Sequence, residues 1–373
     1  MMRTMKKVSL GVAVLVSFRL AILASEPSKI VPDRDGKPAD MSKPVQVFIL
    51  MGQSNMLGMG RVAGEKDGTL EYAIKVKKKY PYLIDDEGNW VVRKDVRYVQ
   101  VMGSGTGPMR LLYNDWLTVK GRRRIGPEVG IGFYLGTVID APVLLLKSCI
   151  GNRSLGWDLL PPGSERFEVV EKDKKTGKLK TYVYAGYKDS PARWEKGTEP
   201  KKIGWYAGMQ YDGDVANAKK VLAELDKYYP GAKGYKIVGF FFWQGDKDRY
   251  SAVYASRYEQ NLVRFIKQLR KDFNAPDAKF VLATLGQTKK GVIKGRWGAN
   301  EAKILEAQLA VDGDSGKYPE FRGNVATVYS YPLCHGGASN THYNGNAETY
   351  MDVGEAMGRA MIRLLKVGSG STR

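Results

Sequence analysis

Short apolar segments alternate along the chain with longer segments of helical length. The apolar segments lie near residues 45–51, 142–147, 236–243, 279–285 and 324–330. Such continuous short runs are typical of strands buried on both faces of a parallel sheet. The longer segments lie near residues 126–139, 205–229, 250–273, 300–311 and 347–365, and they predict helices between and after the strands.

This alternation predicts an α/β fold, a flavodoxin-like three-layer α/β/α sandwich around a central parallel sheet of about five strands. Two charged tracts, residues 61–122 and 165–204, are predicted as insertions with hairpins, whose turns lie at residues 87–89 and near Thr176 and Gly177. Residues 103–107 are glycine-rich but lack the GxGxxG spacing, so they predict a loop and not a dinucleotide site.

The N-terminus has the pattern of a signal peptide. Basic residues precede an apolar run over residues 8–18, and cleavage is expected after Ala24. Arg19 interrupts the apolar stretch, and no later segment is long and apolar enough to cross a membrane. We therefore expect a secreted or periplasmic protein whose parts are a signal peptide (1–24), a lead-in (25–43), one domain (44–366) and a tail (367–373).

The chain of 373 residues is strongly basic, with a formal net charge of +20. Removal of residues 1–24, which hold four basic and no acidic residues, leaves 20 − 4 = +16. Such a charge favours polyanionic partners. No helix-turn-helix, zinc-finger or RNP pattern is present, so nucleic acid is not expected and an acidic polysaccharide is favoured. A basic surface without a specific partner is the alternative.

A candidate nucleophile follows the first predicted strand. Gly52 permits a tight turn there, and Ser54 then lies between Gln53 and Asn55. Open α/β sheets bind their ligands at the carboxyl ends of strands, where a serine can serve as a nucleophile. The alternative from spacing alone is a serine that caps the start of a helix.

A serine nucleophile needs a base, which is most often histidine. The chain has two histidines, His335 and His342, and both follow the last predicted strand. His342 directly precedes the final helix, so we expect it at the same sheet edge as Ser54. Gly151, after the second strand, and Gln244, after the third, are candidate donors to an oxyanion. The alternative for each is a polar turn that closes a strand.

Several motifs resemble a known family. Gly52-Gln-Ser-Asn-Met-Leu-Gly58 is similar to the opening block of the sialate O-acetylesterase-like carbohydrate esterases, within the SGNH/GDSL hydrolase superfamily. In the same order follow Gly126-Pro-Glu-Val-Gly-Ile-Gly132, residues 151–155, Trp243-Gln-Gly-Asp-Lys-Asp248 and the block around His342. The resemblance covers about residues 44–366. The GxSxG elbow of the α/β-hydrolases is absent.

The resemblance implies an esterase that removes acetyl groups from sugars through an acetyl-serine, without a cofactor or metal. It implies Ser54 as nucleophile, His342 as base, and the Ser54 N–H, the Gly151 N–H and the Gln244 side chain as oxyanion donors. Neighbouring residues are expected to bind the substrate: Gln53, Asn55, Asn152, Arg153 and Trp157. Arg153 either holds a carboxylate or sulfate on the sugar or lies on the surface. The sugar, its hydroxyl and any involvement of sialic acid stay open.

The sequence departs from the family pattern at two positions. Ser339 stands where the family usually has an aspartate three residues before the histidine, and Asp246 stands where it usually has a glutamate. Asp246 or Asp248 could orient His342, or a backbone carbonyl could do so in a dyad. The third reading is loss of activity, which makes a glycan-binding protein on the same fold the alternative function.

The only two cysteines, Cys149 and Cys334, exclude a CxxC metal cluster. Both lie near proposed site loops, and in an oxidising compartment a disulfide would tie the two loops together. Two buried free thiols are the alternative.

Overall fold

The computed structural model describes residues 32–34, 36–173 and 176–369. The expected signal peptide lies outside these residues, so its prediction stays open. Within the described ranges, no helix combines the length and the apolar character needed to span a bilayer.

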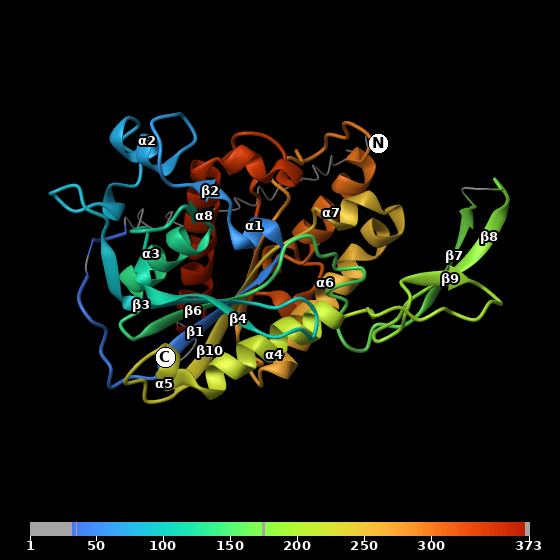
Figure 1. The fold of residues 1–373 in the computed structure, drawn as a ribbon, viewed down its shortest axis with the longest axis horizontal. Coiled ribbons are helices and arrows are strands. Elements are labelled where there is room, and N and C mark those ends of the chain that lie inside the picture. Colours follow the sequence, from blue (N-terminus) through green and yellow to red (C-terminus); the bar gives the residue numbers. More distant parts are fainter. Residues whose placement is uncertain (1–31, 35, 174–175, 370–373) are drawn as a thin grey trace, which may run out of the picture. The chain divides into compact units, whose positions relative to one another are not determined.

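A seven-stranded sheet forms the centre of the molecule, with the order β12-β11-β10-β1-β6-β3-β4 (Figure 1). Every neighbouring pair is parallel except β3 with β4. The order β6-β1-β10-β11-β12 is that of a flavodoxin-like sheet, so the predicted fold class is confirmed. The strands are β1 (Val45–Gly52), β3 (Val92–Met102), β4 (Arg110–Thr118), β6 (Val143–Ser148), β10 (Tyr235–Trp243), β11 (Lys279–Ala283) and β12 (Val325–Val328).

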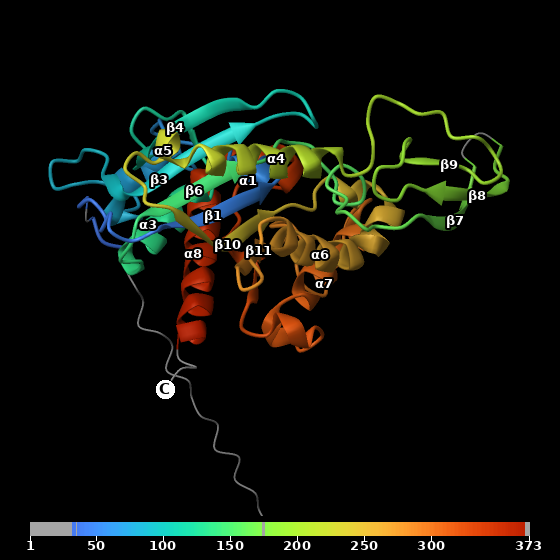
Figure 2. The same ribbon diagram turned by 90° about the horizontal axis from the view of Figure 1, so that it is seen from below.

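Helices cover both faces of this sheet (Figure 2). Leu144 and Leu146 of β6 pack in one core with apolar residues of α4, α6 and α7, while Leu145 lies on the side of α3. Helix α8 packs against α3 and along β11 and β12. The helices are α1 (Ser54–Leu57), α2 (Leu70–Lys75), α3 (Glu128–Val138), α4 (Met209–Ala223), α5 (Leu225–Tyr228), α6 (Ala252–Asp272), α7 (Gly298–Ala310) and α8 (Ala347–Ser369).

The central strand β1 is buried on both faces, as its apolar run predicts. Val47, Phe48 and Ile49 have no exposed surface. Full burial of a side chain of this size stabilises the fold by roughly 1.5–3 kcal/mol. The position of β1 between β6 and β10 is therefore set by its hydrophobic residues.

Strands β3 and β4 extend the sheet from within the tract 61–122, which was predicted to lie outside it. Their charged residues hid them from the pattern of apolar runs. Arg93 is 1% exposed because it pairs with Asp95 and Asp33, and Arg97 stacks on Trp116. The expected hairpin at residues 87–89 is reduced to a single bridge between Ile84 and Trp90.

Two smaller sheets complete the described part. Strands β2 (Gly60–Arg61) and β5 (Arg124–Ile125) pair near α8, and β7 (Phe167–Lys172), β8 (Leu179–Tyr184) and β9 (Arg193–Glu195) form an antiparallel sheet. The β7–β8 pair confirms the hairpin predicted in the second charged tract. This sheet projects away from the central one (Figure 1).

A buried cluster of charges holds the end of α1. Lys147 of β6 donates to Glu128 Oε2 (2.5 Å) and to the carbonyl oxygen of Leu57 (3.2 Å), and Arg122 pairs with Glu128 from the other side. Lys147 and Glu128 have no exposed surface. Burial alone would raise the pKa of Glu128, but the charges of Lys147 and Arg122 lower that pKa to about 2.

We predict that Glu128→Ala lowers the free energy of unfolding by about 3–5 kcal/mol, because it leaves two buried cations without their carboxylate. Denaturant unfolding measures the loss. Glu306 of α7 is exposed and pairs with no residue that the structure describes, so Glu306→Ala is the control variant and should change stability by less than about 0.5 kcal/mol. Equal effects of the two substitutions would contradict a structural role for the cluster.

Candidate active site

Ser54 lies at the carboxyl end of β1, directly after a turn that requires glycine. Gly52 has φ +146°, and a Cβ there would lie 2.4 Å from the carbonyl oxygen of Trp243. Gln53 is the N-cap of α1, and Ser54 is its first helical residue. The capping interpretation of Ser54 is therefore wrong. Ser54 is partly exposed, and its hydroxyl makes no hydrogen bond to the described part of the chain.

Gly151 approaches Ser54 closely. A Cβ built on Gly151 would lie 3.5 Å from the Cβ of Ser54, so a side chain at this position would crowd the hydroxyl. Over the described ranges, the N–H of Gly151 donates no backbone hydrogen bond. The N–H of Ser54, in the first turn of a helix, also lacks an intrahelical acceptor. Two backbone donors are thus present beside the Ser54 side chain.

His342 lies in the 3-10 segment η6 (Ser339–Gly345), which packs against α1. The Nδ2 of Asn55 donates to the hydroxyl of Tyr343 at 3.4 Å, so the neighbours of Ser54 and His342 are in direct contact. His342 is partly exposed, and its imidazole forms no hydrogen bond or ion pair with any described residue. Ser54 and His342 therefore belong to segments that meet at one edge of the sheet, and neither is buried.

The backbone of the histidine segment is left-handed. His342, Tyr343 and Asn344 have φ values of 53°, 53° and 51°. Each non-glycine residue in this region costs roughly 1–3 kcal/mol and persists only where its surroundings hold it. Tyr343 supplies that support, because it is fully buried and its ring stacks on the Trp243 ring, with 5.9 Å between the ring centres.

Asp246 lies against the histidine segment. Its Oδ1 accepts hydrogen bonds from the Ser339 hydroxyl (2.5 Å) and from Arg249 Nε (2.9 Å). Ser339 is the position at which the resembled family usually has an aspartate. The hydroxyl of Ser339 thus connects η6 to a carboxylate that comes from the loop after β10.

Asp248 has a different set of partners. Its two carboxylate oxygens accept from the N–H groups of Leu155 and Gly156, both at 2.8 Å, and from Gln244 Nε2 at 2.6 Å. Burial raises the pKa of Asp248 to about 6, although these hydrogen bonds favour the charged form. Asp248 therefore holds the loop that follows Gly151 and shows no contact with His342.

Gln244 is fully buried within the same network. Its Nε2 donates to Asp248 and to the carbonyl oxygen of Arg153 (2.8 Å), and its Oε1 accepts from Tyr258. Its role as an oxyanion donor stays a prediction, and in this arrangement its amide hydrogens are engaged. Gln53 differs, because its Oε1 accepts from Lys247 N and Gln244 while its Nε2 has no acceptor in the described structure.

The other predicted substrate-binding residues lie around this edge. Asn55 is fully buried and its Oδ1 has no partner among the described residues, while Asn152 is exposed with φ +59°. Trp157 is partly buried against a small cluster of Leu160, Ala185 and Ala207.

Arg153 is anchored by neutral groups. Its guanidinium donates to Ser104 Oγ (2.9 Å) and to Gln210 Oε1 (3.3 Å), and it lies 4.9 Å from the centre of the Trp205 ring. Ser104 and Gln210 were not found from the sequence. The glycine-rich loop around Ser104 was the available signal, since Gln210 binds that loop at Gly103 O and Gly105 N.

Both cysteines are free thiols, so the disulfide considered from the sequence does not form. Cys149 is fully buried at the end of β6, and Cys334 packs against Gly286 and Tyr343. Burial raises the pKa of the Cys334 thiol to about 12. Over the described residues, no group of three or more His, Cys, Asp and Glu side chains is arranged to hold a metal ion.

The fold and the residues at the carboxyl-end edge of the central sheet define a class of protein. It is a flavodoxin-like α/β sandwich with a candidate serine-and-histidine site, and the site lies where the strand order reverses between β1 and β10. Residues 189–363 match the model of a family described as carbohydrate esterase, sialic acid-specific acetylesterase. This match confirms the resemblance drawn from the motifs. The matched part, just under half of the chain, is similar to the sialate O-acetylesterase-like carbohydrate esterases, a family of carboxylic ester hydrolases. It includes His342 and Asp246 but not Ser54.

Solved structures with a similar arrangement have low sequence identity to the chain. A protein of Arabidopsis thaliana is 19% identical, with a TM-score of 0.44 over 86% of this chain and 98% of its own. A carbohydrate acetylesterase of Xanthomonas citri is 14% identical, with a TM-score of 0.48 over 88% of this chain and 57% of its own. NanS is 13% identical, with a TM-score of 0.45 over 87% and 99%. Structural similarity at these TM-scores does not establish an activity for this chain. No curated protein matches the sequence.

The raised pKa of Asp248 predicts a pH-dependent stability. The pKa of Asp248 in the folded state is about 6, above the ordinary value of 3.8, so the folded state binds a proton on this carboxyl more tightly than the unfolded state does. The stabilisation that Asp248 provides is therefore complete below about pH 4 and is lost as the pH rises through about 6. The shift amounts to about 3 kcal/mol. Asp248→Asn cannot titrate, so the unfolding free energy of the unsubstituted protein minus that of the variant should rise between pH 7 and pH 4. Parallel stability curves, measured by denaturant unfolding at each pH, would contradict this assignment.

Proposed function

We propose that the protein is an exported serine esterase that removes O-acetyl groups from an anionic carbohydrate through an acetyl-serine intermediate. One observation carries the proposal. The α1 turn that bears Ser54 lies against Gly151 and against the His342 segment. Export to the periplasm or the medium rests on the N-terminal sequence pattern alone.

In the proposed reaction, Ser54 Oγ attacks the acetyl carbonyl carbon while its proton passes to His342. The N–H groups of Gly151 and Ser54 donate to the oxyanion that forms. Collapse of the intermediate breaks the ester C–O bond, and the sugar hydroxyl leaves with the proton from His342. Water, deprotonated by His342, then releases acetate from Ser54 and restores both residues.

Asp246 is the carboxylate that best fits the orienting role. Among the two acids considered, it alone contacts the histidine segment, through the hydroxyl of Ser339. Asp248 binds the loop after Gly151 instead. We therefore propose that Asp246 takes over, from the neighbouring strand end, the task that an aspartate at position 339 performs in the resembled family.

Arg153 supports an anionic substrate. It lies two residues after Gly151, and no carboxylate of the described structure forms an ion pair with it. The nearby carboxyl of Asp214 is fully buried, and burial raises its pKa well above the ordinary value, although a hydrogen bond from Gln210 and the charge of Arg153 act in the opposite direction. A guanidinium without an ion pair near the reacting ester fits a carboxylate or sulfate on the sugar.

We expect Ser54→Ala and His342→Ala each to lower kcat/KM for a chromogenic acetate ester by at least roughly 10³-fold, because each removes a group needed for acyl transfer. Ser339→Ala keeps both residues and leaves the Asp246 carboxylate held by Arg249, so it should retain most activity. Covalent labelling of Ser54 by an organophosphorus probe gives a second readout. Full activity in His342→Ala would overturn the mechanism. An inactive but folded wild-type protein that still binds glycans would favour the alternative, a glycan-binding protein.

Asp246→Asn should lower kcat by roughly 10²- to 10⁴-fold with a smaller change in KM, because an amide cannot stabilise the imidazolium that forms in the transition state. Steady-state kinetics on the same ester measure this split. Asp314→Asn, at an exposed acid of the 3-10 segment η3 (Gly313–Ser315), is the matched control and should leave both constants unchanged. Wild-type kcat in Asp246→Asn would show that His342 is oriented without this carboxylate.

A further inference from the structure

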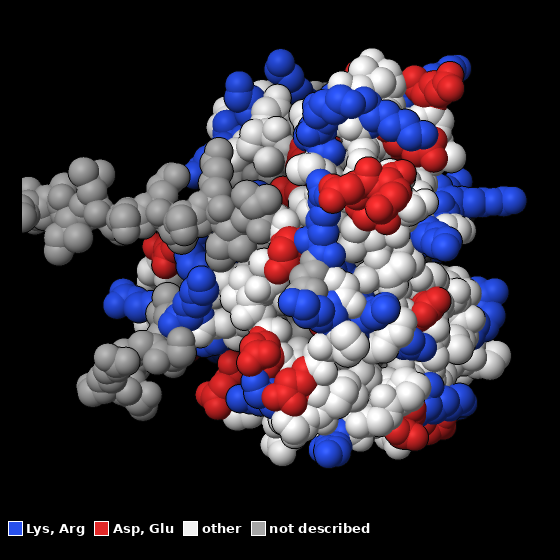
Figure 3. All heavy atoms as spheres, turned by 90° about the vertical axis from the view of Figure 1, so that its left-hand side faces the viewer, with Lys and Arg blue, Asp and Glu red and all other residues white. Residues whose placement is uncertain are grey.

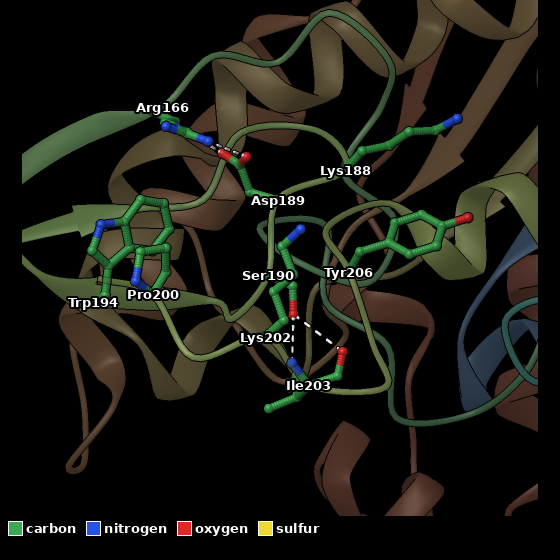
Figure 4. Close-up of a pocket in the computed structure, with 9 residues that line it drawn as sticks. All are labelled: Arg166, Lys188, Asp189, Ser190, Trp194, Pro200, Lys202, Ile203 and Tyr206. Atoms are coloured by element: carbon green, nitrogen blue, oxygen red, sulfur yellow. Dashed lines mark hydrogen bonds and ion pairs between the residues drawn. The ribbon is translucent and has the colours of Figure 1, made fainter. Parts of the chain in front are cut away.

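We infer that the protein carries a second subsite that binds an anionic group of a polymeric carbohydrate, at a distance from Ser54. The inference rests on the proposed function and narrows its substrate to a polymer. A cavity of about 340 Å³ lies between the β7–β9 sheet and the segment that leads into α4 (Figure 4). The size is within the range of pockets that bind small ligands. It is lined by Arg166, Lys188, Asp189, Ser190, Trp194, Pro200, Lys202, Ile203 and Tyr206.

The lining carries excess positive charge. Arg166 and Asp189 neutralise each other through two hydrogen bonds of 2.6 Å. Lys188 and Lys202 are exposed, and neither forms an ion pair with any described residue. Lys188 also has φ +69°, an uncommon backbone conformation for lysine. The ammonium of Lys188 extends away from Trp194 (Figure 4) and lies 5.4 Å from the centre of the Tyr187 ring. Two lysines without an ion pair in the lining of one cavity fit a ligand that carries a carboxylate or sulfate.

Flat aromatic rings lie on two sides of the cavity (Figure 4). Trp194 and Tyr206 are both partly exposed, and Pro200 lies next to Trp194 (Figure 4). The hydroxyl of Tyr206 donates to Asp212 at 2.9 Å, which fixes the ring. Rings of this kind provide rigid contact area for a sugar face, and the lysines provide the charge contact. The lining therefore suits a charged sugar better than a bare inorganic anion.

The cavity is connected to the candidate active site through shared residues. The hydroxyl of Ser190 donates to the carbonyl oxygen of Trp205 at 2.8 Å, and the Trp205 ring supports Arg153. Trp157, on the loop after Gly151, and Trp194 pack against the same small apolar cluster. A single free sugar would need only the Ser54 site. Two separate cationic positions joined in this way fit a chain with repeated negative charges.

A high net charge alone does not create such a site. On the face of the molecule turned away from the β7–β9 sheet, acidic side chains are interspersed among the basic ones (Figure 3). The lysines of the cavity differ because the acid in its lining, Asp189, is already paired. A test must therefore separate this position from the general effect of positive charge.

The experiment compares two variants that each lose two positive charges. Lys188→Asn/Lys202→Gln alters the cavity, and asparagine tolerates the left-handed backbone at position 188. Lys201→Gln/Lys233→Gln removes two exposed lysines that do not line it. Affinity electrophoresis through gels containing polygalacturonate measures binding, and kinetics on O-acetylated polygalacturonate and on a chromogenic acetate ester measure turnover.

We expect the cavity variant to weaken polygalacturonate binding about fivefold or more, and the control variant less than about twofold. The cavity variant should lose a similar factor in kcat/KM on the acetylated polymer and none on the small ester. Equal weakening in both variants, or none in the cavity variant, would overturn the subsite. Absence of ester hydrolysis in the unsubstituted protein would reject the esterase proposal, while the binding comparison would still decide the subsite.

Discussion

The parallel pairing of β1 with β10 is the interaction on which the arrangement of the site depends. It places Gly52 opposite Trp243, so the two strands end side by side and their following turns share one space. The glycine is needed because any side chain would collide with the Trp243 carbonyl oxygen. Trp243 in turn stacks on Tyr343, which extends the same contact to the histidine segment. One strand pair thus aligns three loops that are distant in the sequence.

Much of the fold could be predicted because its central strands are apolar throughout. Where burial depends on hydrophobic residues alone, as for Val47 and Phe48, the pattern of residues is sufficient. Strands β3 and β4 were missed because their buried positions include Arg93, whose charge is matched by acids that only the folded chain brings near. Single-sequence patterns do not record such pairing, and a charged residue in a strand was interpreted as a sign of exposure.

The candidate site shows the same division. Ser54, Gly151 and His342 could be proposed from position, because parallel strands bring their carboxyl ends to one edge. The hydrogen-bond partners of Asp246 and Asp248 could not be predicted in this way. These two acids are separated by one residue, yet one contacts Ser339 and the other contacts the N–H groups of Leu155 and Gly156. Their directions are set by the turn after β10, and sequence spacing gives no indication of which acid faces which loop.

The three left-handed residues at 342–344 limit how this loop can change over evolutionary time. Histidine and asparagine tolerate such backbone angles, whereas β-branched residues strongly disfavour them. Tyr343 has the further restriction that its ring fills a closed space beneath the loop. Residue choice in the segment is therefore narrowed by conformation as well as by chemistry, so even a descendant that had lost catalysis would be expected to keep much of this local sequence.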